Sequence, residues 1–343
     1  MLAGARMSAV REGVALSRPT ATSLMRFSGG DGAWDTLNRL SSSDLFLRDG
    51  QMIHTLWLAQ DATPIADVYV CRNDEEFIVI AEGAGVDLLA HANDNVRLGA
   101  AIEDLSQRFD MLSLHGPFAW ELMGALVGGG VVGVPYLSMF RLDGGGYGFR
   151  AGKTGEYGYD LLVPKEGSAA WEQRIRDAGA RFDLEEVSDG ALDQCRLENW
   201  FFNIRREGKK SLSPLELQLQ WRTSAAKEYV GSAALAERRQ RGIARRMITL
   251  VSPSAIDEGN ALELFGERVG EVLTAGYSDA RGDHVALALV DAAWAHSGID
   301  AFQIGGAAAR SVTPPVIDNR SLYVNPQTHS YATRAESDFP PLA

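Results

Sequence analysis

Three strand-like segments follow one another between residues 52 and 83, and their close spacing constrains the fold more than any other feature of the sequence. The segments "MIHTLWL" and "IADVYVCR" flank the turn "AQDATP", and "EEFIVIAEG" follows soon after. Antiparallel strands can be joined by such short turns, whereas parallel strands need a long crossover connection. The region therefore predicts an antiparallel sheet.

The character of the sequence changes after about residue 243. Short strand patterns with turn signals follow one another there: "MITLVS", "ALELFGERVGEVLTAGYS", "HVALALVD" and "SVTPPVID". Strands at this spacing predict a small β-barrel or sandwich. The charged stretch "ERRQRGIARR" (237–246) precedes them, so we expect two regions, residues 1–240 and residues 241–343.

Helical and strand-like patterns alternate in the rest of the chain. Helices are expected in "GAWDTLNRLSSSDL" (32–45), "GVDLLAHANDNVRL" (85–98), "PFAWELMGAL" (117–126) and "DLEEVSDGALDQCRLENWFFNI" (183–204). Strands are expected within "IEDLSQRFDMLSLHG" (102–116), and a turn followed by a strand of alternating Leu and Gln in "SLSPLELQLQW" (211–221). The glycine-rich "VGGGVVGV" lacks the spacing of a nucleotide-binding loop and is expected to be a flexible connector.

Composition narrows the class of protein. The 343 residues are 45% apolar and 23% charged, enough for two or three packed units of a globular protein. A membrane span and a signal peptide are both lacking, so we expect a cytoplasmic protein. The net charge of -12 argues against nucleic acid as a partner. Cys71 and Cys195 are expected to be reduced packing residues, and no histidine spacing indicates a metal site.

The stretch "GKTGEYGYDLLVP" (152–164) combines a tight turn with paired carboxylates. Gly155 and Gly158 favour a reversal that leads into the strand "YDLLVP". Glu156 and Asp160 lie close together beside tyrosine rings. Carboxylates beside stacking surfaces can bind a flat heterocycle that offers N–H donors. The alternative is that these residues only build the turn and the strand.

Six segments in a fixed order carry a resemblance to a known family. They are "HTLWLAQDATPIADVYV", "LSLHGPFAWELM", "GKTGEYGYDLLVP", "CRLENWFFNI" with "SLSPLELQLQW", "KEYVGSAAL" and "VGEVLTAGYSDARGDHVALALVD". Together they resemble the glycine-cleavage T-protein (aminomethyltransferase) superfamily, which includes folate-dependent demethylases. The resemblance implies an α+β fold of two interleaved lobes, one of them ferredoxin-like, and a C-terminal antiparallel barrel. A central cavity between these units would hold tetrahydrofolate.

The resemblance also implies roles for individual residues. Asp160 matches the carboxylate that the family presents to the pterin ring, and such a group would accept hydrogen bonds from the pterin N–H donors. Asp67 matches the family aspartate near folate N5, where an anion would assist one-carbon transfer. Tyr69, Glu156 and Lys153 lie in the same two motifs and are expected to contribute to the folate site.

Several positions depart from the family pattern. The first aspartate of the family pair is Ala66, the tyrosine usual before "TGE" is Lys153, and a usual asparagine is Glu82. His54 stands where many relatives have a tyrosine facing the cavity; it would either protonate a leaving group as a methyl departs or be a structural histidine. These changes weaken the case for an aminomethyltransferase that accepts a lipoyl arm.

A run of aromatic residues points to a different substrate. Trp200, Phe201 and Phe202 replace the small residues that usually follow "RLE", and they would form a pocket for an apolar or aromatic methyl donor. The other possibility is that they belong to the hydrophobic core. A longer N-terminal segment of the family is missing, so we expect no carrier protein as a partner.

The expected function is therefore a tetrahydrofolate-dependent transferase of a methyl or methylene group, most plausibly a demethylase of a small-molecule methyl donor. Three alternatives remain from the sequence: a glycine-cleavage-type aminomethyltransferase, a folate-binding protein without catalysis, and a family scaffold that no longer uses folate. Cys71 and Cys195 lie outside the cysteine motif typical of the non-catalytic branch.

Overall fold

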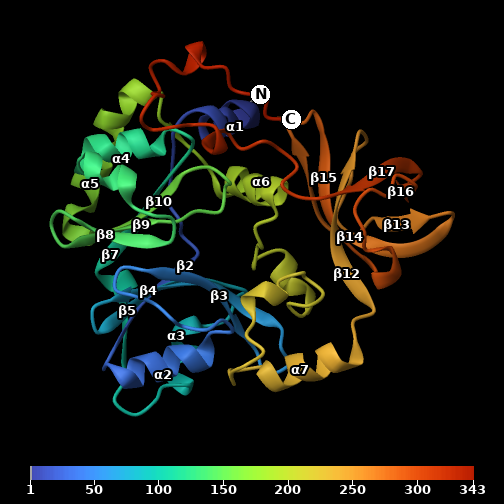
Figure 1. Ribbon diagram of the computed structural model, residues 1–343, viewed down its shortest axis with the longest axis horizontal. Helices are drawn as coiled ribbons and strands as arrows, with labels where there is room; N and C mark the ends of the chain where they lie inside the picture. The colour runs from blue at the N-terminus through green and yellow to red at the C-terminus, as the bar shows by residue number, and fades with distance from the viewer. Residues whose placement is uncertain (1) are drawn as a thin grey trace.

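A computed structural model describes residues 2–343 and shows two α+β lobes beside a β-barrel (Figure 1). The expected fold class is confirmed, including the interleaving of the lobes: one sheet takes a strand at residues 15–17 and later the strands between residues 109 and 186, and the other takes the strands between residues 22 and 104. Within the described residues no helix is long and apolar enough to cross a membrane.

A five-stranded antiparallel sheet forms the lobe drawn in blue in Figure 1. Its order is β3 (Met52–Leu58), β4 (Pro64–Asn73), β5 (Glu76–Gly83), β2 (Thr22–Ser28) and β6 (Ala101–Asp104). The three strands expected between residues 52 and 83 are its first three members. Apolar residues on alternate positions, such as Ala66, Val68 and Val70, pack in one core with residues of the helices α2 (Asp31–Leu40) and α3 (Leu88–Asp94).

A six-stranded sheet forms the second lobe. Its order is β11 (Glu185–Glu186), β1 (Ala15–Ser17), β7 (Phe109–His115), β10 (Gly158–Pro164), β9 (Gly146–Arg150) and β8 (Ser138–Leu142). Only β1 and β11 pair in parallel. The helices α4 (Ala119–Val127) and α5 (Lys165–Gly179) cover one face of this sheet, where Leu112, Tyr159 and Leu161 are buried with Trp171 of α5.

The other faces of the two sheets share a core. Tyr69 and Ile80 from the five-stranded sheet are buried in one cluster with Phe149 and Leu162 from the six-stranded sheet. Each strand therefore turns one set of alternate residues to its own helices and the other set to the opposite lobe. This arrangement brings polar residues of the inner faces into the space between the lobes.

The C-terminal strands close into an antiparallel barrel, as expected from their spacing. Its strands are β12 (Arg245–Ser252), β13 (Ala261–Leu264), β14 (Glu267–Ser278), β15 (Asp283–Asp291), β16 (Phe302–Ile304) and β17 (Ala307–Val312). Leu250, Leu262 and Phe302 are buried in its core. The predicted strand "SVTPPVID" was wrong beyond Val312, because Pro314 and Pro315 have no N–H to continue a ladder.

Three other predictions differ from the structure. The segment "SLSPLELQLQW" contains no strand. Instead Ser213 donates its N–H and hydroxyl to Glu216, and the N–H of Leu217 bonds to the carbonyl of Ser213, so a helical turn forms. The helix expected over 183–204 is restricted to α6 (Asp189–Asn199), and β11 takes the residues before it. The glycine-rich connector contains a 3₁₀ helix over Gly129–Gly133.

The chain after the barrel returns to the lobes. Figure 1 shows this segment, in red, running across to the helices of the six-stranded sheet and to α1 (Leu2–Glu12). Tyr331 packs edge-on against the rings of Phe118 and Phe182, with ring centroids 5.6 Å apart in both pairs. Val324 is buried in the same core. The last residues of the chain therefore stabilise the lobe in which its first residues lie.

Limited proteolysis tests the boundary that we propose near residue 240. The helix α7 (Ser232–Arg241) ends at Gly242, and Arg241, Ala244 and Arg245 are exposed before β12 begins. We expect trypsin to cut first between residues 237 and 246, because cleavage requires an accessible backbone. Mass spectrometry of the first fragments would identify the site, and an initial cut inside β14 would contradict the proposed boundary.

Candidate functional site

Strand register places four polar side chains on the inner face of the five-stranded sheet. His54 of β3 lies opposite Tyr69 of β4, and Asp67 of β4 lies opposite Glu82 of β5. Residues paired in this way point to the same side of a sheet, and residues two apart along a strand do so as well. The imidazole of His54 stacks on the ring of Tyr69, with centroids 4.2 Å apart.

Asp67 is the centre of a buried ion cluster. Its Oδ1 accepts a hydrogen bond from Arg222 at 2.8 Å and lies 2.6 Å from His54 Nε2, while Lys153 Nζ is 2.7 Å from Oδ2. Burial opposes ionisation of Asp67, but His54 and the positive charges of Lys153 and Arg222 outweigh it and hold its pKa well below the usual range. Asp67 is therefore ionised at neutral pH, with both oxygens occupied.

Lys153 also connects this cluster to Glu82. Its Nζ lies 2.8 Å from Glu82 Oε1, and Arg196 of α6 approaches both oxygens of Glu82 at 2.8 and 2.9 Å. Burial again disfavours the charged carboxylate, yet Lys153 and Arg196 lower the pKa of Glu82 to about 2. Three cations, Lys153, Arg196 and Arg222, thus surround two carboxylates, so the cluster carries a formal charge of +1 while His54 is neutral.

His54 is held as a neutral imidazole in this cluster. Arg222 can only donate, so His54 Nδ1 accepts its hydrogen bond at 3.0 Å and Nε2 carries the proton that faces Asp67. Burial lowers the pKa of His54 to about 4, assisted by the positive charge of Arg222. A neutral ring with both nitrogens occupied has no free proton for a leaving group. His54 is therefore suited to orient Asp67, which corrects the proton-donor role expected from the sequence.

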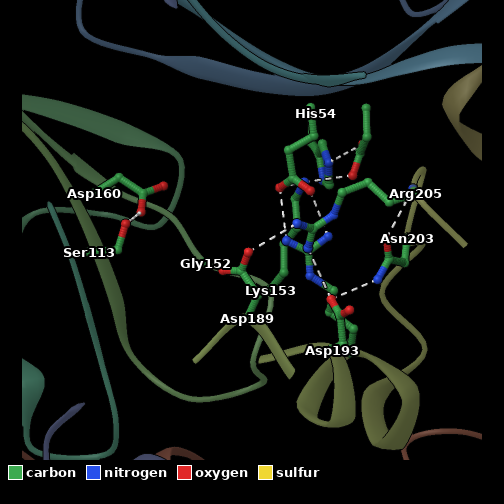
Figure 2. A network of polar contacts seen from close by, with 12 residues as sticks. His54, Ser113, Gly152, Lys153, Asp160, Asp189, Asp193, Asn203 and Arg205 are labelled. Carbon is green, nitrogen blue, oxygen red and sulfur yellow. Dashed lines mark hydrogen bonds and ion pairs between the residues drawn. The ribbon is translucent and has the colours of Figure 1, made fainter. Parts of the chain in front are cut away.

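Asp160 lies apart from the ion cluster on the inner face of the other lobe. It pairs with Ser113 across β10 and β7, and the Ser113 hydroxyl donates to its Oδ1 at 2.5 Å. Figure 2 shows these two residues separated from His54 and Lys153. Burial raises the pKa of Asp160 to about 6, although the Ser113 hydrogen bond opposes this change. Its second oxygen has no partner among residues 2–343.

Two cavities adjoin these residues, and Lys153 lies in the lining of the first. The first cavity is lined by Tyr69, Ile80, Glu82, Ser113, His115, Lys153, Asp160 and Arg196, with the segment 19–22 and part of α6. The second is lined by His54, Tyr136, Arg150, Tyr157, Trp200, Phe201, Trp221 and Arg222. The expected site residues are thus divided: Asp160, Tyr69 and Lys153 border one cavity, whereas His54, Trp200 and Phe201 border the other.

Two residues expected to bind substrate or folate have other neighbours in the structure. Phe202 lines neither cavity, because its side chain is buried with Ile204 and Leu217 in the core next to the barrel. Glu156 borders the second cavity, but its oxygens accept hydrogen bonds from the N–H groups of Arg320 and Ser321 at 3.1 and 2.7 Å. We assign Glu156 to fixing the C-terminal segment, since both oxygens are occupied.

Some residues of the site were not singled out from the sequence. Arg222, 155 residues from Asp67, directly follows the segment 211–221 that was expected to be a strand, so nothing indicated that it reaches the cluster. His115 was considered only among the histidines whose spacing indicates no metal site, yet it borders the first cavity, and its Nδ1 is buried without a partner among the described residues. Arg196 lies inside the motif "CRLENWFFNI", which was the available signal, and Glu82 was noted only as a departure from the family pattern.

A second polar group lies beside the first cavity (Figure 2). Arg205 is 3.3 Å from Asp189 and 3.1 Å from Asp193, and Asn203 donates to Asp193 at 2.8 Å. These contacts join the start of α6 to the chain that follows it. Within residues 2–343 no group of three His, Cys, Asp or Glu side chains is arranged to hold a metal ion.

Comparisons with known proteins identify the family. Residues 2–227 match the GCVT N-terminal domain, and residues 245–318 match the glycine cleavage T-protein C-terminal barrel domain. The chain therefore belongs to the glycine cleavage T-protein family. It is 27% identical over 270 residues to an aminomethyltransferase of Thermotoga neapolitana, covering 75% of this chain and 73% of that protein. An aminomethyltransferase of Rubrobacter xylanophilus is 28% identical over 275 residues, with 77% and 72% covered.

A solved structure has the same fold. The glycine cleavage system aminomethyltransferase T from Bartonella henselae superposes with a TM-score of 0.81 and 20% identity, covering 93% of this chain and 90% of that one. This likeness supports the arrangement of lobes and barrel described above.

Replacing Lys153 tests whether the ion cluster stabilises the fold. Lys153→Met should lower the free energy of unfolding by about 3 kcal/mol at pH 7, because Asp67 and Glu82 lose a shared buried cation. The value lies at the low end for a broken buried pair because each carboxylate keeps an arginine. Urea denaturation would measure it. The exposed Lys165→Met is the control, and a loss below about 1 kcal/mol in Lys153→Met would refute the assignment.

Proposed function

We propose that this member of the glycine cleavage T-protein family moves a one-carbon unit from a small-molecule donor to tetrahydrofolate. The observation that carries the proposal is the free oxygen of Asp160 at the wall of the first cavity. A buried carboxylate with an unused acceptor is suited to a ligand that brings N–H donors. The matched family supports the choice of a pterin as that ligand.

The other residues of the first cavity fit a pterin in chemical terms. The Tyr69 hydroxyl and His115 Nδ1 are buried polar atoms without partners among the described residues, and both side chains border this cavity. Such atoms are costly unless a ligand or water satisfies them, and a pterin carries both donors and acceptors along its edge. Tetrahydrofolate would supply the nitrogen that receives the one-carbon unit. Asp160, Tyr69 and His115 would hold and orient it.

The charge of the ion cluster favours a particular leaving group. Asp67 was expected to assist transfer as an anion near folate N5, but a cluster with a net positive charge does not stabilise a developing positive charge. It stabilises the negative charge that develops on oxygen or sulfur when a methyl group leaves. Lys153 and Arg222 supply this charge, and Asp67 holds both cations in place. The cluster therefore supports demethylation of an ether or thioether.

A glycine-cleavage-type aminomethyltransferase is the second candidate. Its support is that the relatives named above are aminomethyltransferases. Such an activity would require a protein that carries the aminomethyl group as the partner of this chain. The same cavity for tetrahydrofolate would serve transfer from a small molecule and transfer from a carrier protein. The identity of the donor therefore distinguishes the two candidate functions.

Titration with a stable folate tests the cofactor site. Binding of 5-formyltetrahydrofolate at pH 7.5 should weaken roughly 10- to 100-fold in Asp160→Ala, the effect of losing one charge-assisted hydrogen bond, and should be unchanged in the exposed control Asp143→Ala. Because the pKa of Asp160 is about 6, lowering the pH to 5.5 should weaken binding to the wild type roughly fourfold and leave Asp160→Ala unaffected. Equal affinity of both variants by calorimetry would reject the site.

Product analysis separates the two candidate donors. We expect 5-methyltetrahydrofolate to accumulate when the protein is incubated with tetrahydrofolate and a panel of methyl ethers and thioethers. Chromatography with mass spectrometry would detect it. Formation of methylenetetrahydrofolate and ammonia only from an aminomethylated carrier protein would favour the second candidate and exclude the first.

A further inference from the structure

Lys227 differs from other lysines of the chain in its hydrogen-bond partners. The sequence contains five lysines, and two of them, Lys153 and Lys210, lie within 2.8 Å of a carboxylate oxygen. Lys227 Nζ instead donates to the backbone carbonyl and to the side-chain oxygen of Asn38, both at 2.8 Å. Among the described residues no carboxylate forms an ion pair with Lys227. The amine is therefore held by neutral acceptors.

The surroundings of Lys227 favour an uncharged amine. Its side chain is half-buried, and its Nζ lies 5.8 Å from the centre of the Tyr229 ring. Burial lowers the pKa of Lys227 to about 8, although the negative charge of Asp44 opposes this change. An uncharged lysine amine keeps two hydrogens and gains a lone pair. Because the two oxygens of Asn38 can accept both hydrogens, the lone pair stays free to attack an electrophile.

Asn38 also lines a hollow beside α2, on the outer side of the five-stranded sheet (Figure 1). The hollow has a volume of about 560 Å³, and its other lining residues are Asp35, Arg39, Arg97, Leu98 and Glu228. Neither Arg39 nor Arg97 forms an ion pair with a described residue. Asp35 and Glu228 balance the formal charge of the hollow, so an anion would be held by direct contact with the guanidinium groups. Two free guanidinium groups near a nucleophilic amine are suited to a phosphate.

We propose that Lys227 is a site of acylation by small acyl phosphates, with the phosphate of the reagent held by Arg39 and Arg97. This modification is independent of the one-carbon transfer proposed above. The uncharged amine attacks the carbonyl carbon, and a C–N bond forms. The bond between that carbon and the phosphate oxygen breaks, and inorganic phosphate leaves with the electron pair. The amine nitrogen releases one proton to solvent, so an uncharged amide remains on Lys227.

Acylation would change the contacts of the segment that precedes α7. An amide nitrogen has one hydrogen, so acylated Lys227 can donate to only one of the two Asn38 oxygens. The same segment is held by Ser224, whose N–H donates to the carbonyl of Ser42 at 2.7 Å. Arg222 of the ion cluster lies just before it. The proposed modification therefore falls on the segment that carries Arg222.

Mass spectrometry of the full-length protein tests the proposal. The protein is incubated with acetyl phosphate at pH 7.5, and acetylation of each lysine is quantified after the remaining amines have been capped with a deuterated reagent under denaturing conditions. We expect the initial rate at Lys227 to be at least about tenfold that at the exposed Lys165, because a much larger fraction of Lys227 is uncharged. The rate at Lys227 should level off above about pH 8, whereas the rate at Lys165 should rise up to pH 9.5.

Variants separate phosphate recognition from the reactivity of the amine. Arg97→Gln should slow acetylation of Lys227 by acetyl phosphate at least about threefold, because the reagent loses one guanidinium contact. The same variant should leave acetylation of Lys227 by the uncharged N-acetoxysuccinimide unchanged. Arg181→Gln, which is exposed as Arg97 is, should change neither rate.

Three results would overturn the proposal. The first is a rate at Lys227 no higher than that at Lys165 in the unmodified sequence. The second is an equal rate with acetyl phosphate in Arg97→Gln and in the wild type, which would leave a reactive amine without phosphate recognition. The third is faster labelling of Lys227 by acetyl-coenzyme A than by acetyl phosphate at the same concentration, which would assign the site to thioesters.

Discussion

The ion cluster around Asp67 is the interaction on which the site depends. Its members come from six parts of the chain: the strands β3, β4 and β5, the turn before β10, helix α6 and the turn that contains Arg222. Asp67, Lys153, Arg196 and Arg222 are buried and Glu82 is largely so, and each of these charges would be unfavourable alone. Close packing of the two lobes therefore requires that these carboxylates and cations pair with one another. Lys153, which lies between Asp67 and Glu82, forms part of the wall of the first cavity.

The division of that space into two cavities follows from the same contacts. Lys153 and Glu82 border the first cavity, and His54 and Arg222 border the second, with Asp67 bonded to residues of both. A reaction between ligands in the two cavities would take place across this cluster.

Much of the fold could be predicted because it depends on local patterns. Alternating apolar residues indicated β3 to β5, and the close spacing of turns indicated the barrel. Asp160 was found through a turn motif, which is also local. The pairing of Lys153 with Glu82, and of Arg222 with Asp67, depends on tertiary packing over 71 and 155 residues and left no signal in composition or spacing. The division of the expected residues between two cavities was hidden for the same reason.

The anchoring of residues 320 and 321 by Glu156 has a consequence for the order in which the site is assembled. Ser321 and Leu322 form part of the second cavity, although most of its wall is made by residues 54 to 222. Protein chains are synthesised from the N-terminus, and domains fold as they emerge. The first cavity can thus be built from residues made early, whereas the second gains its last side only after the barrel strands have been translated. In the nascent protein, the walls of the first cavity would therefore be complete before those of the second.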